Sequence, residues 1–289
     1  MQKTGKKRPL RPPQRQARPG QEKRMRPLPV FDYPEKNGTG KLKGKTALIS
    51  GGDSGIGKAI AVLFAKEGAD IAIAYLNEHA DATGTKKIIE ETYHKKCVLI
   101  PGNLGNEKHC KQVVAKTIRS LGRLDIVVNN AAQQYENKRI EGITTAELLK
   151  TFQTNIFSFF WITKESLRYM KKGSCIINTS SVTAYRGSAA LLDYAATKGA
   201  IVSFTRSLSA NLVKKGIRVN GVAPGPVWTP LIPSSFPGKK TAMHGSDTPM
   251  ERAAQPAEIA PSYLFLASED ANYITGQFIH PNGGEIING

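Results

Sequence analysis

The sequence predicts an α/β fold, with one doubly wound parallel sheet of about seven strands and helices on both faces. Two observations predict it. Short apolar runs of strand length alternate with longer helical patterns from about residue 44 to the end of the chain. The first apolar run also leads straight into a glycine-rich turn and then a helix. Right-handed crossovers would bring the carboxyl ends of the strands to one ligand-binding edge.

The first half of the domain follows this pattern closely. The apolar runs KTALIS, ADIAIAY, CVLIPGNL and LDIVVNNAA have strand length, and the segments between them carry helical patterns. The predicted strands are residues 45–50, 69–75, 97–104 and 124–132. The predicted helices between and after them are residues 58–68, 77–95, 106–121 and 144–170.

The second half repeats the alternation. Predicted strands CIINTSS, IRVNGVAPG and GQFIHPNGG cover residues 175–181, 217–225 and 276–284. A helix bearing Tyr194 and Lys198 is expected to end near Gly216, and a last helix covers 257–267. Residues 228–250 are rich in Pro, Gly and Ser, which is typical of a mobile lid over a substrate.

Some apolar side chains near this lid have two interpretations. Trp228 and Phe236 would either line an apolar wall of the pocket or pack the lid onto the domain. Tyr185 and the pair Leu191 and Leu192 would either form part of the pocket or belong to the core. The residues alone favour neither reading.

Length and composition exclude several classes of protein. A chain of 289 residues, 40% of them hydrophobic, can bury a large core. No apolar run approaches the ~20 residues that a membrane helix needs. The three cysteines Cys97, Cys110 and Cys175 are odd in number and far apart, which indicates reduced thiols of a cytoplasmic protein. The histidines and cysteines form none of the common metal-binding motifs, so we expect no metal site.

The first 40 residues differ from the rest. The net charge is +18, and residues 1–26 hold ten Lys or Arg against the single acid Glu22, which gives +9. This stretch is rich in proline and poor in large apolar residues, so residues 1–40 are expected to form an extended or disordered arm before a domain at 41–289. It has no apolar core of a secretory signal. An arm that binds nucleic acid or anionic membrane is one interpretation; a solvated tail without a specific partner is the favoured one.

The glycine-rich turn, residues 51–57, indicates dinucleotide binding. Glycines allow a tight turn and close approach of the backbone to a pyrophosphate, and the following helix offers N–H groups and a positive dipole end. A strand, such a turn and a helix in that order are typical of a Rossmann-type fold. From Gly52 the residues also match the P-loop pattern up to Lys58, but Ala59 stands where a hydroxyl would hold magnesium. This mismatch counts against an NTPase.

Tyr194 and Lys198 would lie one turn apart on one face of a helix. A free tyrosine has a pKa of about 10 and is a poor acid or base near neutrality. A neighbouring ammonium favours the phenolate and brings the proton within useful range. Ser181 would supply a hydroxyl to bind the oxygen of a reacting carbonyl. Alone, such a pair is most often an amphipathic tyrosine beside a solvated lysine.

Taken together, the motifs resemble the short-chain dehydrogenase/reductase family over roughly residues 40–289. The motifs occur in this order: SGGDSGIG at 50–57, NNAA at 129–132, Asn155, Ser181, Tyr194 with Lys198, and PGPVWT at 224–229. The chain looks most like bacterial glucose-dehydrogenase-like members with an extended N-terminus. The resemblance implies a single Rossmann-type domain, usually a homotetramer, that moves hydride between a nicotinamide cofactor and an alcohol or carbonyl.

The resemblance also implies roles for individual residues. Tyr194 would be the general acid in carbonyl reduction and the base in alcohol oxidation. Lys198 would lower the pKa of Tyr194 and hold the nicotinamide ribose, while Ser181 would orient the substrate oxygen. Asn155 would hold a water of a proton relay. Besides Tyr194 and Lys198, the implied cofactor contacts are Gly51, Asp53, Ser54, Gly55, Ile56, Gly57, Tyr75, Leu76, Asn103, Leu104, Asn130, Ala131, Pro224, Gly225, Val227 and Thr229.

Three positions depart from the family's usual pattern. The threonine that commonly opens the glycine turn is Ser50, which keeps the hydroxyl. The last glycine of Asn-Asn-Ala-Gly is Ala132, and an acid that often meets the adenine is Asn103, whose carbonyl oxygen can still accept a hydrogen bond. None of these changes removes a catalytic group.

The choice of cofactor rests on the residues after the second predicted strand. An acid there would favour the ribose hydroxyl of NAD, and an arginine the 2′-phosphate of NADP. This chain has Tyr75, Leu76 and Asn77, while Asp53 and Glu78 would repel a phosphate. We therefore expect NAD, with NADP as the alternative.

The substrate is expected to be a small sugar, polyol, ketone or aldehyde, since nothing in the sequence favours one of these. Two other classes of function stay open. The chain would be a dinucleotide sensor without catalysis, or a nucleic-acid-associated protein that acts through its basic arm. The presence of Ser181, Tyr194 and Lys198 together argues against the sensor.

Overall fold

The computed structural model describes residues 6–287, and these form a seven-stranded parallel sheet in the order β3-β2-β1-β4-β5-β6-β7. The order reverses direction between β1 and β4, as in a doubly wound Rossmann-type sheet. The predicted fold class is confirmed. The strands are β1 (Thr46–Ser50), β2 (Asp70–Tyr75), β3 (Cys97–Pro101), β4 (Ile126–Asn129), β5 (Cys175–Thr179), β6 (Arg218–Val222) and β7 (Phe278–Ile279).

The helices connect these strands and extend the loops at their carboxyl ends. The α-helices are α1 (Gly55–Lys66), α2 (His79–Lys87), α3 (Glu107–Leu121), α4 (Thr145–Phe152), α5 (Ser158–Ser166), α6 (Thr183–Arg186), α7 (Leu192–Leu212), α8 (Leu231–Ser235), α9 (Gly238–Ala242) and α10 (Pro256–Ala267). Shorter 3-10 or π turns are η1 (Glu22–Arg24), η2 (Ile88–Thr92), η3 (Ile140–Gly142), η4 (Gln153–Phe157), η5 (Val213–Lys215) and η6 (Glu269–Ala271).

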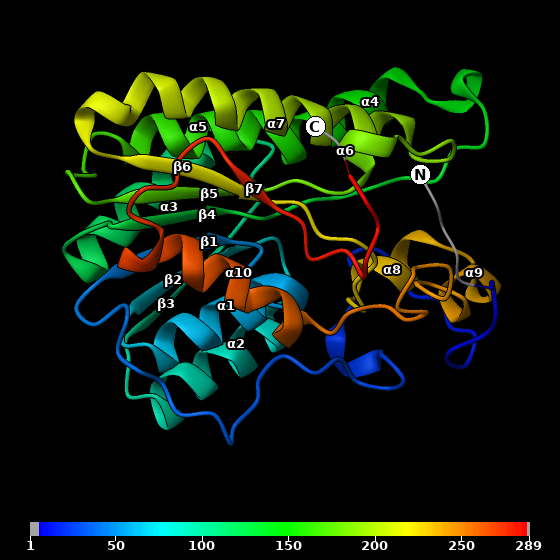
Figure 1. The fold of residues 1–289 in the computed structure, drawn as a ribbon, viewed down its shortest axis with the longest axis horizontal. Helices are drawn as coiled ribbons and strands as arrows, with labels where there is room; N and C mark the ends of the chain where they lie inside the picture. Colours follow the sequence, from blue (N-terminus) through cyan, green and yellow to red (C-terminus); the bar gives the residue numbers. More distant parts are fainter. Residues whose placement is uncertain (1–5, 288–289) are drawn as a thin grey trace.

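Helices cover both faces of the sheet (Figure 1), with α1, α2 and α10 on one side and α3, α5 and α7 on the other. The side chains of β1 show why both faces of the sheet need to be covered. Ala47 and Ile49 belong to a buried cluster that includes Phe64 of α1. Leu48, between them, belongs to a second cluster with Val113 of α3. Because successive strand residues point to opposite faces, β1 is buried on both sides.

Three predicted elements differ from the structure. The helix predicted over 77–95 is α2 followed by the π turn η2, and the one over 144–170 is α4, the π turn η4 and α5. The strand predicted over 276–284 is only the two residues of β7. Apolar periodicity does not register the extra residue of a π turn. Pro281, which follows β7 closely, cannot donate a ladder hydrogen bond and limits the strand.

The segment 228–250, predicted as a lid, contains the short helices α8 and α9. Trp228 is fully buried and Phe236 is nearly so. Both belong to a cluster with Tyr194, Leu191 and Met25. Trp228 therefore packs the lid onto the rest of the molecule.

The arm is extended over residues 6–40 apart from η1, and it runs along α8 and α9 before passing beneath α1 (Figure 1). It is docked on the domain at several points, although most side chains of residues 6–19 are exposed. Leu10 N–H donates to Ala242 O, and Gln16 N–H donates to Pro233 O, each at 2.8 Å. Met25 is fully buried. The interpretation as a solvated tail is wrong for this part of the arm, because the domain supplies apolar contacts and carbonyl partners that the arm lacks on its own.

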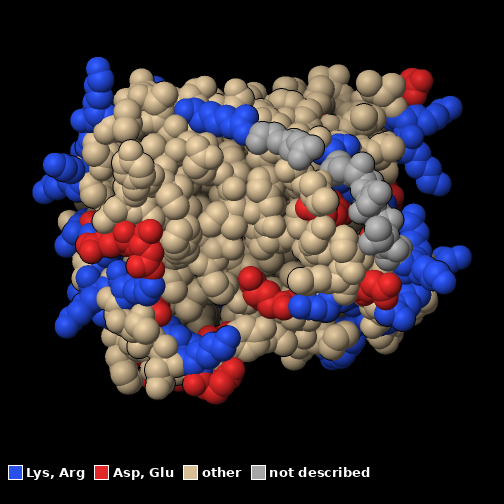
Figure 2. Space-filling model, in the orientation of Figure 1, with Lys and Arg blue, Asp and Glu red and all other residues tan. Residues whose placement is uncertain are grey.

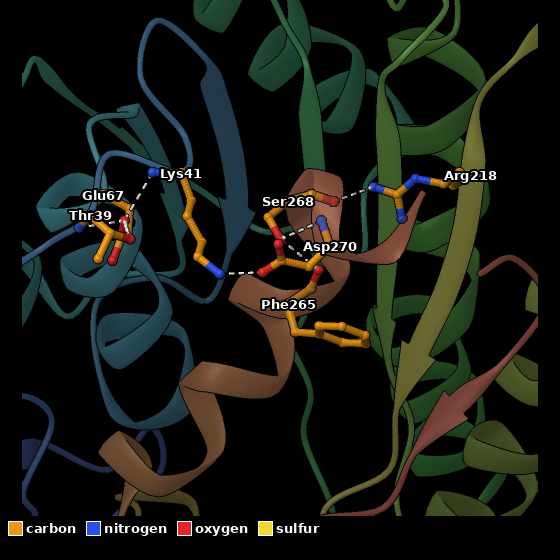
Figure 3. A network of polar contacts seen from close by, with 7 residues as sticks. All are labelled: Thr39, Lys41, Glu67, Arg218, Phe265, Ser268 and Asp270. Carbon is orange, nitrogen blue, oxygen red and sulfur yellow. Dashed lines mark hydrogen bonds and ion pairs between the residues drawn. The ribbon is translucent and has the colours of Figure 1, made fainter. Parts of the chain in front are cut away.

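The end of the arm is fixed to the helices beside β1 (Figure 3). The buried Glu67 carboxylate accepts hydrogen bonds from the N–H and hydroxyl of Thr39 and from the N–H of Lys41, each at 3.0 Å. The Lys41 ammonium pairs with Asp270, whose N–H donates to Ser268 Oγ after α10. These contacts tie the chain to both α1 and α10 just before the first strand.

Charged side chains are mixed on the face shown in Figure 2, where Lys and Arg gather mainly towards the two ends among Asp and Glu. Cations of the arm are engaged within the chain. Arg8 pairs with Glu251 at 3.0 Å, and the guanidinium of Arg18 lies 4.2 Å from the centre of the Tyr135 ring. Among residues 6–287, no helix combines the length and apolar character needed to cross a membrane.

Candidate functional site

A cavity of about 1060 Å³ opens at the carboxyl ends of the strands, between the glycine turn, α7 and the lid. Most of the residues implied by the motifs line it. Those that do are Gly51, Asp53, Ser54, Gly55, Ile56, Tyr75, Leu76, Asn103, Leu104, Asn130, Ala131, Ser181, Tyr194, Lys198, Pro224, Gly225, Val227 and Thr229. Gly57 and Asn155 lie behind the wall of the cavity.

The glycine turn forms a narrow cradle at the start of α1. Gly51 and Gly55 have left-handed φ angles of +66° and +54°, which glycine adopts at little cost. A Cβ on Gly57 would overlap the carbonyl oxygen of Gly51, so α1 can approach the turn closely only with glycine there. The N–H groups of the first turn of α1 and its dipole suit an anionic group. A dinucleotide pyrophosphate fits this cradle.

Ser50 fixes the glycine turn to the end of β4. Its hydroxyl accepts the N–H of Asn130 at 2.9 Å and of Ala131 at 3.1 Å. The Asn130 amide in turn donates to Ser50 O and Gly51 O, at 3.2 and 3.3 Å. The serine thus provides the hydroxyl that the resemblance expects of a threonine.

Three candidate catalytic side chains share one wall of the cavity. Ser181 and Tyr194 are 8% and 9% exposed, and Lys198 is 1% exposed. The Lys198 ammonium donates to Thr179 O at 2.8 Å and lies 5.3 Å from the centre of the Tyr194 ring. The end of β5 and the first turns of α7 hold these groups together.

Burial dominates the protonation of this wall. It raises the pKa of Tyr194 to about 12, although a hydrogen bond with Ser181 opposes the rise. It also lowers the pKa of Lys198 to about 7. Lys198 is not among the causes of this shift, so the lowering of the Tyr194 pKa by Lys198 stays a prediction. Both groups are desolvated, and desolvation disfavours the charged form of each.

Asn155 lies in the π turn η4 between α4 and α5. Its amide oxygen accepts Gln133 N–H at 2.9 Å, and its amide nitrogen donates to Gln133 O at 2.9 Å and to Thr197 Oγ1 at 3.2 Å. These bonds fix the segment after β4 against α7. Asn155 thus supports the cavity wall from behind.

Acidic side chains gather at the end of the cavity near β2. Asp53 is 6% exposed, and burial followed by the charge of Glu78 raises its pKa to about 7. Tyr75 and Leu76 line the same end. The Tyr75 hydroxyl forms a 2.9 Å hydrogen bond with His79 Nδ1. A second phosphate placed here would face two carboxyl groups.

Several lining residues were missed by the sequence analysis. The arm contributes Lys7, Arg18, Pro19 and Gly20, and the segment after β4 contributes Gln133, Gln134 and Tyr135. An extended arm has no periodicity that would reveal which face it buries. Among the uncertain apolar side chains, Leu191 and Phe236 line the cavity, whereas Trp228, Tyr185 and Leu192 are not among its lining residues.

Comparisons with known proteins agree on one family. A family model described as enoyl-(acyl carrier protein) reductase matches residues 51–285. The chain is 58% identical to the uncharacterized oxidoreductase YhxC of Bacillus subtilis over 98% of this chain and 99% of the relative. It is 51% identical to NADPH-dependent aldehyde reductase 1, chloroplastic, of Arabidopsis thaliana, over 94% and 96% of the two chains. It is 49% identical to glucose and ribitol dehydrogenase of Daucus carota, over 96% and 98%.

Solved structures resemble the fold closely. A short-chain dehydrogenase from Burkholderia cenocepacia in complex with NADP has a TM-score of 0.79 at 28% identity, covering 84% of this chain and 98% of the other. A 3-ketoacyl-(acyl-carrier-protein) reductase from Brucella melitensis complexed with NADH has a TM-score of 0.76 at 28% identity, with the same coverage.

Proposed function

The chain belongs to the short-chain dehydrogenase/reductase family of oxidoreductases, and we propose that it transfers hydride between a nicotinamide dinucleotide and a small alcohol or carbonyl substrate. The observation that carries this proposal is the shared cavity. Ser181, Tyr194 and Lys198 lie on a wall of the same cavity that the glycine turn borders. A dinucleotide in the cradle would reach the wall where a substrate oxygen meets Tyr194.

Each residue has a role that its surroundings support. When bound, the nicotinamide ring gives or accepts the hydride. The Tyr194 hydroxyl donates a proton to the carbonyl oxygen in reduction and takes it back in oxidation. Ser181 holds the same oxygen and stabilises charge growing on it. Lys198, fixed by Thr179 O, stabilises negative charge on Tyr194 whenever its own amine is protonated.

We propose NAD as the preferred cofactor, with NADP as the alternative. Glu78 supports this preference, because a 2′-phosphate at its end of the cavity would meet a carboxylate. Asp53, whose pKa is raised to about 7, carries only part of a negative charge at neutral pH. The related proteins do not support this preference, since one relative is named NADPH-dependent and two solved structures contain NADP or NADPH, against one that contains NADH. Titration with NADH and NADPH tests the preference. Binding of NADPH tenfold tighter than NADH would reverse it.

The substrate proposed is a sugar, polyol, ketone or aldehyde, which makes the reaction one at a CH–OH group. The names of the plant relatives include an aldehyde, glucose and ribitol, in keeping with this range. Screening alcohols, sugars and aldehydes by absorbance of the reduced cofactor would identify the compound. A screen in which only enoyl thioesters react would exclude the proposed reaction.

The organisation proposed is an arm over residues 1–40, a catalytic domain over 41–289, and a homotetramer located in the cytoplasm. Cys97, Cys110 and Cys175 are buried free thiols, in keeping with a reducing compartment. Exposed apolar side chains on α4, η4 and α5 support assembly.

Replacing Tyr194 by Phe tests the central assignment. The Tyr194→Phe variant should bind NADH nearly as well as the wild type and lose turnover by about 10² or more, the usual contribution of a general acid or base. Tyr185→Phe is the matched control, since Tyr185 is not among the residues lining the cavity. Unchanged turnover in Tyr194→Phe would reject the assignment.

A sensor without catalysis and a nucleic-acid-binding protein are the competing functions. The first predicts dinucleotide binding without turnover of any alcohol or carbonyl. The second is disfavoured because cations of the arm, such as Arg8 and Arg18, are already engaged within the chain. Salt-dependent binding to duplex DNA that exceeds the affinity for NADH would favour it.

A further inference from the structure

The arm lies outside the segment that the family model matches, residues 51–285, yet it borders the cavity. Arg18, Pro19 and Gly20 form part of the wall. At Gly20 the arm is so close to the lid that a Cβ would overlap Pro230 O. The backbone of the arm therefore packs directly against the backbone of the lid beside the cavity.

Glu22 attaches the arm to the glycine turn. Its side chain is 8% exposed, and one carboxylate oxygen accepts Gly55 N–H at 3.0 Å. The other oxygen pairs with Lys58 Nζ at 2.5 Å, and the Lys58 side chain is only 13% exposed. The Glu22 N–H donates to Asp81 Oδ2 at 2.8 Å. The carboxylate thus pairs with the first N–H of α1 and with a cation in the same turn, where the helix dipole favours negative charge.

Glu22 makes these contacts from outside the cavity. It is not among the lining residues, whereas Gly55 and its neighbour Ile56 are. Glu22 holds the turn in place without occupying the space of a ligand.

A few residues further on, the arm is attached to the lid. Met25 is fully buried in the cluster that contains Tyr194, Leu191 and Trp228. The indole N–H of Trp228 donates to Pro27 O at 2.9 Å. Residues 22–27 therefore connect the cofactor cradle, the wall bearing Tyr194 and the lid.

We propose that the N-terminal arm is a built-in part of the active site and that Glu22 is the positioning residue that locks it to the cofactor cradle. The inference rests on the proposed function, because the cradle is taken to bind a nicotinamide dinucleotide. Glu22 fixes the backbone of the glycine turn, and residues 25–27 hold the lid against the same arm. Loss of the anchor loosens the cradle and the lid together.

The test uses the full-length protein with Glu22→Ala, Glu22→Gln and the control Lys23→Ala, whose native side chain is exposed on the same arm. Dissociation constants for NADH and NADPH are measured by calorimetry, and kcat and KM with a substrate found in the screen. Glu22→Ala should weaken binding of the preferred dinucleotide about tenfold, because the glycine turn loses the carboxylate that fixes Gly55 N–H and Lys58 in place. Glu22→Gln keeps an acceptor for the N–H, so its loss should be smaller.

The pattern of kinetic constants separates positioning from catalysis. At saturating cofactor, kcat should change less than twofold, since Glu22 is not among the cavity-lining residues that meet the reacting atoms. KM for the substrate should rise together with the cofactor dissociation constant. Lys23→Ala should match the wild type in every measurement.

A folded Glu22→Ala that binds both dinucleotides as tightly as the wild type overturns the inference. So does an equal loss in Lys23→Ala. If Glu22→Ala does not fold, the double variant Glu22→Gln with Lys58→Met leaves no unpaired charge and takes its place, with the smaller loss expected of Glu22→Gln and the same contradicting result. A wild-type protein that binds neither dinucleotide would instead defeat the proposed function, whatever the variants do.

Discussion

The buried pair Tyr194 and Lys198 shows how a residue's surroundings set its chemistry. Burial raises the pKa of the phenol to about 12 and lowers that of the amine to about 7. In the proposed alcohol oxidation Tyr194 loses its proton, so a protonated Lys198 would help by favouring the phenolate. In the proposed reduction Tyr194 donates its proton, and its raised pKa means that the phenol is protonated at neutral pH.

The Lys198→Met variant should therefore lose alcohol oxidation more than carbonyl reduction. Its oxidation rate at pH 7 should fall by about 10², and its pH–rate curve should move to higher pH because the phenolate loses a stabilising cation. Lys198→Arg keeps a cation and should recover part of the rate. Rates measured in both directions between pH 6 and 10 give the comparison; identical curves for Lys198→Met and the wild type would contradict it.

Asp53 predicts a pH dependence of stability. Burial and the charge of Glu78 raise its pKa in the folded state from 3.8 to about 7. Below about pH 4 the carboxyl group is protonated in both the folded and the unfolded protein, so it costs no stability there. As the pH rises towards 7, only the unfolded state loses the proton, and the free energy of unfolding falls. Asp53→Asn should thus equal the wild type in acid and exceed it at pH 8 by about 1–3 kcal/mol in free energy of unfolding. Urea denaturation at pH 4, 6 and 8 measures this, with the exposed Glu141→Gln as control; parallel curves for Asp53→Asn and the wild type would rule it out.

At the scale of elements, the sequence predicts well which segments form helices or strands. It predicts less well where those elements are interrupted. Six of the strand patterns are long apolar runs, and each produces a strand at nearly the expected place. The helix over 144–170 was predicted as continuous, because a π turn adds one residue without removing the apolar pattern. That interruption carries Asn155 and aims its amide at the segment after β4. The short helices of the lid were missed because five residues are too few to show a period.

Asn155→Ala should show what the π turn contributes. The change removes three hydrogen bonds, two with the backbone of Gln133 and one with Thr197. The Gln133 N–H and C=O would lose their partner, so the free energy of unfolding should fall by about 1–3 kcal/mol, together with turnover. Thr197→Val loses only one of the three bonds and should have a smaller effect. Equal stabilities for Asn155→Ala and the wild type would mean that the turn holds its shape without this amide.

At the scale of the whole molecule, the arm is the part that the sequence describes least well. Its composition predicts an extended chain, since it lacks the apolar content of a core. What it cannot show is that the domain provides the missing partners, such as the pocket around Met25 and the N–H of Gly55. The candidate catalytic residues, in contrast, have a fixed spacing after β5 and on the first turns of α7. The sequence therefore predicts the place of Ser181 and Tyr194 in the fold. It does not predict that the arm packs beside them.

The outer face of α4, η4 and α5 bears on assembly. Leu149, Phe157 and Phe160 are 50%, 39% and 50% exposed, and the Phe160 ring lies 4.2 Å from that of Phe204 on α7. Figure 1 shows α5 and α7 on the face of the sheet opposite α1 and α10. Exposed aromatic and aliphatic groups cost free energy in water, which supports this face as the contact in the proposed tetramer.

Phe160→Lys should therefore shift the protein from the proposed tetramer to smaller species at micromolar concentration, because a buried ammonium without a partner is strongly disfavoured. Light scattering coupled to gel filtration gives the mass of each species. Leu28→Lys, at a 56% exposed position on the arm, is the control and should leave the mass unchanged. Phe160 is not among the residues lining the cavity, so NADH binding by Phe160→Lys should stay within about twofold of the wild type. A Phe160→Lys protein with the mass of the wild type would exclude this face as the contact between copies.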